Sequence, residues 1–252
     1  MSTAAPDDWD DHWDRYDASA RENPAQAYRR RLVFDLLERA GRPQRLLDVG
    51  SGQGDLLAQA RARWPQAELA GVELSRSGIA AAAGKVPDAV FVQRDLLVPG
   101  PPDAKLAGWA THAVCMEVIE HVERPSELLA TASELMAPGS QLVITVPGGP
   151  MSAFDRHIGH RTHYTSETLR AVIVEAGLRV EQVMSAGFPF FNLYRRLVIM
   201  RGERLIEDVD SSSGAELPRS AKAIMRGFDV AFRTNRADSR WGTQMVAVAR
   251  VG

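Results

Sequence analysis

Short apolar runs alternate with longer stretches of helical periodicity along most of the chain, and this rhythm predicts repeated β-α units. Such units are typical of a parallel sheet that carries helices on both faces. Asn23 and Pro24 supply a cap and a first-turn proline for one helix, and Gly41 and Pro43 end it. We predict strands at 45–49, 67–72, 89–93, 111–115, 140–146, 178–184 and 244–249, and helices at 24–39, 54–63, 75–84, 125–137 and 166–177.

Two segments depart from this rhythm. Near the N-terminus, Trp9, Trp13 and Tyr16 share one helical face among several acids, so 9–22 is either a helix packed on the main domain or a lid over a ligand. Before the last strand, 193–209 and 218–233 are predicted as helices, which form either a substrate cap or a dimerisation element. We divide the chain into a tail with lid helices (1–40), a core (41–186), a helical insertion (187–240) and a final strand (241–252).

A glycine-rich turn follows the first predicted strand. Gly50, Gly52 and Gly54 occupy alternate positions, where a missing Cβ permits positive φ and lets a ligand lie against the backbone. The helix that follows directs its N-terminal amides and its dipole back at the turn. The spacing differs from the G-x-G-x-x-G of pyrophosphate-binding folds, and it favours a nucleotide ligand without a diphosphate.

Acidic side chains stand at the ends of the first three predicted strands, at Asp48, Glu73 and Asp95. In a doubly wound sheet, ligands bind at the carboxyl ends of the strands, so these acids are expected at one edge. Glu73 is suited to accept hydrogen bonds from a ribose diol. Asp95 is suited to accept one from an adenine amino group, with the backbone amide of Leu96 beside it.

The D-x-G-x-G-x-G run from Asp48 to Gly54 and the two later acids resemble the donor-binding motifs of class I S-adenosylmethionine-dependent methyltransferases. The resemblance covers 45–150 and the closing strand. It implies an α/β fold with a seven-stranded, doubly wound, Rossmann-like sheet, and S-adenosylmethionine as the cofactor. The donor-binding residues that it implies are Asp48, Gly50, Ser51, Gly52, Gly54, Glu73, Leu74, Asp95, Leu96 and Glu117.

A second motif follows the fourth predicted strand. Glu117, Glu120 and His121 are spaced i, i+3 and i+4, so one turn of helix would put all three on one face. The segment resembles the E-x-x-E-H of two methyltransferase groups, the O-methyltransferase of ubiquinone biosynthesis and the small-RNA 3′-terminal 2′-O-methyltransferase. In both groups the segment is associated with a divalent metal beside the methyl donor. In other small-molecule methyltransferases with similar segments, the first acid often only borders the methionine part of the cofactor.

Three further histidines, His157, His160 and His163, lie in or beside one predicted loop. In the RNA group a later histidine completes the metal site, and His160 is its best counterpart here. The alternative is that His157 and His163 only form hydrogen bonds within the loop. The resemblance implies Mg²⁺, Mn²⁺ or another divalent metal at Glu117, Glu120, His121 and His160. Without metal, His121, His160 and Glu120 are the candidate catalytic residues.

Several arginines follow at helical spacing in the predicted insertion. Such a run is typical of a solvated helix face, and the alternative is that it holds an anionic group of a substrate, such as a phosphate or carboxylate. The residues are Arg195, Arg196, Arg201 and Arg204.

Composition narrows the class of partner. The 252 residues are 45% hydrophobic, enough for one sizeable α/β domain, and the net charge of −2 provides no basic field for a nucleic-acid backbone. A single cysteine, Cys115, suits a reducing cytoplasm. No signal peptide is recognisable and no apolar run reaches about 18 residues, so we expect no membrane partner.

These observations predict a cytoplasmic S-adenosylmethionine-dependent methyltransferase that acts on a small-molecule acceptor. An O-methyltransferase is favoured, because a hydroxyl needs deprotonation and the histidines and carboxylates provide for it. Three alternatives stay open. One is a methyltransferase of RNA 3′ ends, and another is an enzyme of the same fold that uses S-adenosylmethionine for another reaction, such as cyclisation. The third is a regulatory or scaffold protein that binds the cofactor without catalysis, against which the full set of donor residues speaks.

Overall fold

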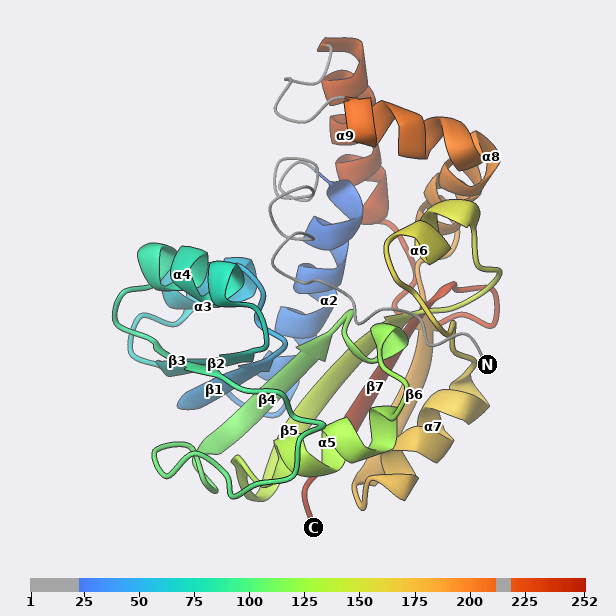
Figure 1. Cartoon of the computed structure of the whole chain (residues 1–252). Coiled ribbons are helices and arrows are strands. Elements are labelled where there is room, and N and C mark those ends of the chain that lie inside the picture. The colour runs from blue at the N-terminus through green and yellow to red at the C-terminus, as the bar shows by residue number, and fades with distance from the viewer. Residues whose placement is uncertain (1–22, 212–218) are drawn as a thin grey trace, which may run out of the picture.

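The computed structural model describes residues 23–211 and 219–252, and the helix predicted over 9–22 lies outside them. Seven strands form one sheet in the order β3-β2-β1-β4-β5-β7-β6 (Figure 1), which confirms the predicted fold class. The strands are β1 (Arg45–Val49), β2 (Glu68–Glu73), β3 (Val90–Gln93), β4 (Ala110–Met116), β5 (Met136–Pro147), β6 (Arg179–Ala186) and β7 (Gln244–Arg250).

The last strand runs against the others, a direction that the β-α rhythm does not predict. Strands β1 to β5 are parallel, whereas β7 lies between β5 and β6 and is antiparallel to both. In Figure 1 the helices that precede β7 stand beyond the carboxyl ends of the parallel strands. The chain therefore re-enters the sheet from that edge and runs in the opposite direction.

Helices cover both faces of the sheet, because alternate side chains of the central strands point to opposite sides. Leu47 and Cys115 lie in the same core as residues of α5 (Pro125–Ser133) and α7 (Ser166–Glu175). Leu46 and Val114 lie in a second core with residues of α2 (Pro24–Arg39) and α3 (Asp55–Arg63). The remaining helix beside the sheet is α4 (Arg76–Lys85).

The predicted insertion is helical. It contains α8 (Phe190–Ser211) and α9 (Arg219–Phe232), which pack on each other, and α8 also packs on α6 (Ala153–His157). Tyr28 of α2 joins this unit, with ring centroids 5.2 Å from Phe191 and 5.5 Å from Phe232. None of the helices in the described ranges is long and apolar enough to cross a membrane.

One predicted boundary is wrong. The helix expected over 125–137 ends at Ser133, and β5 already begins at Met136, which pairs with Ala110 of β4. Leu135 and Met136 are buried in the sheet core. Apolar positions that suggested one more helical turn therefore belong to the start of a buried strand.

Replacement of Gly54 by alanine tests the packing of the glycine turn. Gly54 has φ +76°, and an added Cβ would lie 2.7 Å from Cβ of Ala82 on α4. We expect Gly54→Ala to lower the free energy of unfolding by roughly 2–4 kcal/mol in urea denaturation, from left-handed backbone strain and overpacking. The control is Gly84→Ala on α4, where nothing lies within 4 Å. This variant should be neutral or more stable, and an equal loss in both variants would contradict the argument.

Candidate functional site

The glycine turn after β1 has the conformation that the sequence predicts. Gly50, Gly52 and Gly54 have φ of 71°, 50° and 76°. At Gly50 the constraint is also one of packing, since an added Cβ would lie 2.5 Å from Cγ2 of Val118, just after β4. The turn is therefore held close to the segment that carries the second motif.

Glu73, at the end of β2, closes the turn. Its Oε2 accepts a hydrogen bond from the Gly52 amide at 2.8 Å, and its Oε1 accepts from the amides of Leu74 and Ser75 at 2.9 Å each. A carboxylate is an acceptor only, and here three backbone amides fix the orientation of both of its oxygens. Glu73 is thus fixed by the backbone at the place where the resemblance implies a ribose contact.

The other predicted donor residues lie around the same edge. Burial and the charge of Glu73 raise the pKa of Asp48 to about 8. Asp95 accepts a hydrogen bond from the amide of Leu97 at 2.8 Å, and Leu96 is buried beside it. Ser51 is buried and Leu74 is exposed. The roles of these residues as donor ligands stay predictions.

Glu117 lies in a buried network that joins four elements. Its Oε2 is 2.9 Å from Nη2 of Arg29 on α2. Its Oε1 accepts hydrogen bonds from Gln244 of β7 at 2.8 Å and from Thr145 of β5 at 3.0 Å. Arg29 in turn donates from Nε to Gln244 at 2.8 Å. Both oxygens of Glu117 are therefore occupied by protein groups.

The expectation that Glu117, Glu120 and His121 share one helical face is wrong. Glu117 has φ +57°, the only positive φ among the non-glycine residues that the structure describes. The 3₁₀ helix η1 starts two residues later and spans Ile119–His121. Because the left-handed residue turns the chain before η1, the side chain of Glu117 points into the network with Arg29. Glu117 therefore is not part of the group that Glu120 and His121 join.

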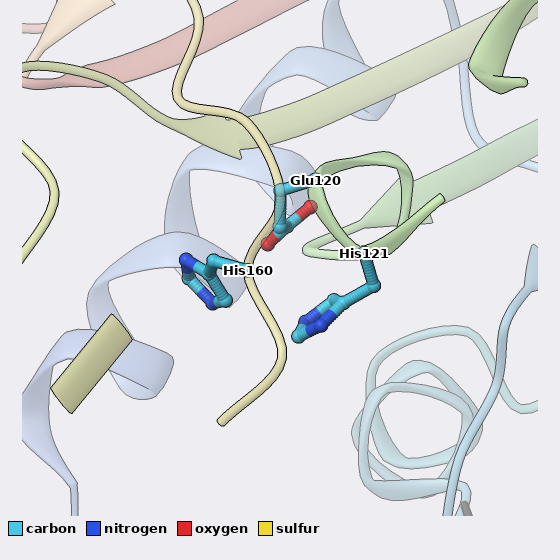
Figure 2. Close-up of side chains that lie close together, drawn as sticks. All are labelled: Glu120, His121 and His160. Atoms are coloured by element: carbon cyan, nitrogen blue, oxygen red, sulfur yellow. The ribbon is translucent and has the colours of Figure 1, made fainter. Parts of the chain in front are cut away.

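Glu120, His121 and His160 come together, as the second motif predicts. Each offers a ligand atom within 4.8 Å of the other two. Figure 2 shows the three side chains pointing toward one another, with Glu120 and His121 from η1 and His160 from the segment between α6 and α7. The rings of His121 and His160 meet edge to face, with centroids 4.7 Å apart. We refer to these residues as the Glu120 triad.

Burial sets the protonation of the Glu120 triad. The Glu120 side chain is fully buried, and neither carboxylate oxygen has a hydrogen-bond partner within the described ranges. Burial and the charge of Glu117 raise the pKa of Glu120 well above its usual range. Burial, reinforced by His121, lowers the pKa of His160 to about 3. The triad thus combines the neutral imidazole of His160 with the carboxyl group of Glu120, whose oxygens form no hydrogen bond with another described residue.

A second group adjoins His160. His163 Nε2 lies 3.1 Å from His160 Nδ1, and His163 Nδ1 lies 3.1 Å from the carbonyl oxygen of Gly149. Asp155 binds Arg195 with Nη1–Oδ1 and Nη2–Oδ2 distances of 2.9 and 3.2 Å. Asp155 also accepts hydrogen bonds from the amide and hydroxyl of Ser152. Burial opposes its ionisation, but Arg195 and Ser152 hold the pKa of Asp155 at about 2.

Sequence reasoning missed several of these residues. Arg195 was expected on a solvated face or on a substrate anion, and it is instead buried against Asp155. Arg29 and Gln244 carried no local signal, because their partner Glu117 lies far away in sequence. Asp155 had a weak signal, since Ser152 and Asp155 form a capping box at the start of α6.

Arg30, also missed, is a buried arginine on α2. It is 9% exposed, its Nε is buried without a hydrogen-bond partner, and no ion pair with another described residue involves it. Burial lowers the pKa of Arg30, whereas the charge of Asp55 raises it. Asp55 directly follows Gly54 and is itself paired with Lys85 at 2.5 Å. Arg30 is therefore a buried positive charge close to the glycine turn.

Glu117→Gln tests whether Glu117 is a structural residue. Loss of the carboxylate leaves the buried Arg29 guanidinium without its counter-charge, so we expect the free energy of unfolding to fall by about 3 kcal/mol or more in urea denaturation. The control is Glu127→Gln, which removes an exposed pair with Arg124 and should cost less than about 1 kcal/mol. A Glu117→Gln protein as stable as the parent would refute the structural role.

Most of the chain, including the glycine turn and the Glu120 triad, is similar in sequence to known proteins. A family model described as a methyltransferase domain matches residues 25–183. The trans-aconitate 2-methyltransferase of Mycobacterium tuberculosis (strain ATCC 25177 / H37Ra) is 30% identical over 160 residues, which are 61% of this chain and 58% of that protein. The chain thus spans little more than half the length of this curated relative.

Solved structures share the fold. That of the cyclase SpnF aligns with a TM-score of 0.62 at 17% identity, over 100% of both chains. That of geranyl diphosphate C-methyltransferase from Streptomyces coelicolor A3(2), in complex with Mg²⁺, geranyl diphosphate and S-adenosyl-L-homocysteine, aligns with a TM-score of 0.56 at 16% identity, over 90% of this chain and 79% of that chain. At these identities the likeness shows the fold alone. Because the family model covers well over half of the sequence, the chain belongs to the methyltransferase-domain family, within the class I S-adenosylmethionine-dependent methyltransferases.

Proposed function

We propose that the protein transfers the methyl group of S-adenosylmethionine to an oxygen atom of a small molecule, and that the Glu120 triad lies beside the acceptor. The observation that carries this proposal is the position of the triad. It begins directly after β4, next to the glycine turn after β1, where the order of the strands reverses. Ligands of doubly wound sheets bind at this reversal point.

The donor would lie along the glycine turn. Glu73 is held in place to accept from its ribose, and Asp95 from its adenine. Arg30 supplies the missing counter-charge for the carboxylate of the methionine part, since it is buried near Gly54 with no anion of its own among the described residues. An arginine in this state forms strong charge-assisted hydrogen bonds with a carboxylate.

An acceptor hydroxyl must lose its proton when it is methylated, so the site needs a group that takes this proton. The main task of the protein is to align sulfur, methyl group and acceptor in line and to exclude water. His160 is neutral, because burial lowers its pKa to about 3, and one of its ring nitrogens has a lone pair. A ring with so low a pKa takes the acceptor proton only when an ionised Glu120 balances the positive charge that the imidazole gains.

The Glu120 triad also fits a divalent metal. One carboxylate and two imidazoles within 4.8 Å of one another form a ligand set that Mn²⁺, Fe²⁺ or Zn²⁺ accepts. The buried oxygens of Glu120 lack hydrogen-bond partners in the described part of the chain, and a cation would satisfy them. A metal bound there would lower the pKa of an acceptor hydroxyl. Glu117 is not included, since Arg29, Gln244 and Thr145 occupy its carboxylate.

A small acceptor is supported by the net charge of −2, which opposes phosphate-backbone binding. The relatives and the solved methyltransferase structure above are also named for small molecules. The fold leaves a cyclisation open as the second candidate, since the aligned SpnF structure is that of a cyclase. The products separate these reactions: methyl transfer yields S-adenosylhomocysteine, an intramolecular cyclisation of the donor yields methylthioadenosine, and a [4+2] cyclisation of the substrate leaves S-adenosylmethionine unchanged.

Arg30→Gln tests the donor site. We expect calorimetry to show that the affinity for S-adenosylhomocysteine falls by about 10- to 100-fold, because the variant loses a charge-assisted hydrogen bond to the carboxylate. Methylthioadenosine lacks the carboxylate, so its affinity should change by less than about twofold. The control, Arg31→Gln, removes a pair with Asp229 of α9 and should leave both affinities unchanged. An equal loss for both ligands would refute the carboxylate contact, and no binding of either ligand by the parent protein would refute the donor site.

His121→Ala and Glu120→Gln test the acceptor site. Metal-stripped parent protein should bind S-adenosylhomocysteine without metal and should bind Co²⁺ or Mn²⁺ in a separate calorimetric event. Each variant should lose metal affinity by on the order of 100-fold, because one of three ligands is removed, while it keeps its affinity for S-adenosylhomocysteine. Cofactor binding without any metal event would exclude the metal and leave His160 as the general base.

A further inference from the structure

Two groups of potential metal ligands share His160, and they differ in charge. The first is the Glu120 triad, and the second consists of Asp155, His160 and His163. In the second group the carboxylate of Asp155 is already neutralised by Arg195, and both of its oxygens accept hydrogen bonds. A cation there would lie against a buried guanidinium. The second group is therefore suited to a role other than metal binding.

The acceptors around His163 determine where the protons lie. The carbonyl oxygen of Gly149 only accepts hydrogen bonds, so His163 Nδ1, at 3.1 Å, is the donor. The ring of His163 is buried, and the neighbouring carboxylate of Asp155 is already paired with Arg195, so no free anion of the described residues is beside His163 to favour a second proton and Nε2 has a lone pair. The contact of 3.1 Å between His163 Nε2 and His160 Nδ1 then requires the proton on His160 Nδ1. His160 in turn has its lone pair on Nε2.

The surroundings hold His163 in place. Its side chain is 5% exposed, and Nε2 lies 3.8 Å from Oδ2 of Asp155. Asp155 is fixed by Ser152 of its own capping box and by Arg195, which is 8% exposed on α8. The same segment is tied to η1, because the amide of Arg161 donates to the carbonyl oxygen of Glu120 at 2.8 Å. The ring of His163 is thus held by the Gly149 carbonyl oxygen at Nδ1 and by its burial beside the Asp155–Arg195 pair, with which it forms no hydrogen bond.

We propose that His163 is a positioning residue, which holds His160 with its proton on Nδ1 and its lone pair on Nε2, where the lone pair is available to a divalent cation or to an acceptor proton. The inference rests on the proposed role of the Glu120 triad. Ring nitrogens of metal-binding histidines are commonly fixed in this way by a hydrogen bond from the other nitrogen. The Asp155–Arg195 pair extends this support to the helical insertion.

The tautomer of His160 tests the inference without metal or substrate. Long-range ¹H–¹⁵N NMR on imidazole-labelled, metal-stripped protein should show the proton of His160 on Nδ1. In His163→Phe, which cannot accept a hydrogen bond, this tautomer should no longer dominate. In His163→Gln the amide oxygen can accept, and the tautomer should be retained. A proton on Nε2 of His160 in the parent protein, or a tautomer unchanged in His163→Phe, would overturn the inference.

Metal affinity provides the second readout. We expect His163→Phe to bind Co²⁺ about 10- to 100-fold more weakly than the parent, the usual effect of losing such a supporting residue, and His163→Gln to recover most of the affinity. S-adenosylhomocysteine affinity, which should stay within about twofold, verifies that the variants are folded. The control is His157→Phe, at an exposed histidine of the same segment, which should change neither affinity. If the parent protein binds no metal, the metal proposal fails, and the tautomer measurement alone decides the role of His163.

Discussion

The buried ion pair between Glu117 and Arg29 fixes the relation of the N-terminal helix to the centre of the sheet. Through Gln244 and Thr145 the pair also includes β7 and β5, so one carboxylate joins α2, β4, β5 and β7. Breaking such a pair leaves a buried charge uncompensated, which costs more than the pair contributes when intact. The arrangement of the residues at the carboxyl ends of the strands depends on this network, because it anchors the end of β4 at Glu117, where the chain turns into η1.

Two carboxylates three positions apart have opposite environments. Glu117 faces a guanidinium at 2.9 Å, whereas Glu120 is fully buried beside two imidazoles, and neither of its oxygens has a hydrogen-bond partner among the residues that the structure describes. Pairs of titratable groups whose environments differ in this way commonly divide the work of a site. Here one carboxylate provides structure, and the other has a raised pKa, so that its ionised form needs an incoming cation or an imidazolium as counter-charge. The positive φ at Glu117 makes the separation possible, as a helical turn would place both acids on one face.

The sequence predicts those features that depend on local pattern. Alternating β-α units give the strands and most helices, and the glycine spacing gives the three positive φ values of the turn. Glu120, His121 and His160 could be grouped because their motif resembles a known one. The role of Glu117 could not be predicted, because it depends on Arg29 and Gln244, which are brought near only by the folded sheet. The direction of β7 likewise depends on where the insertion places the chain, and strand periodicity carries no information about direction.

The groups around His160 have protonation states that stay fixed near neutral pH. Arg195 and Ser152 hold the pKa of Asp155 at about 2, so this carboxyl group is ionised and its pair with Arg195 persists down to strongly acidic pH. Burial lowers the pKa of His160 to about 3 and also lowers the pKa of His163, so both rings are neutral near pH 7. The helical insertion is therefore bound to the site through the ion pair between Arg195 and Asp155. The position of the lone pair on His160 depends instead on its hydrogen bond with the neutral ring of His163. Electrostatics that are arranged before a ligand arrives need no reorganisation during the reaction, and this is the form of stabilisation that contributes most to transfer of a charged group.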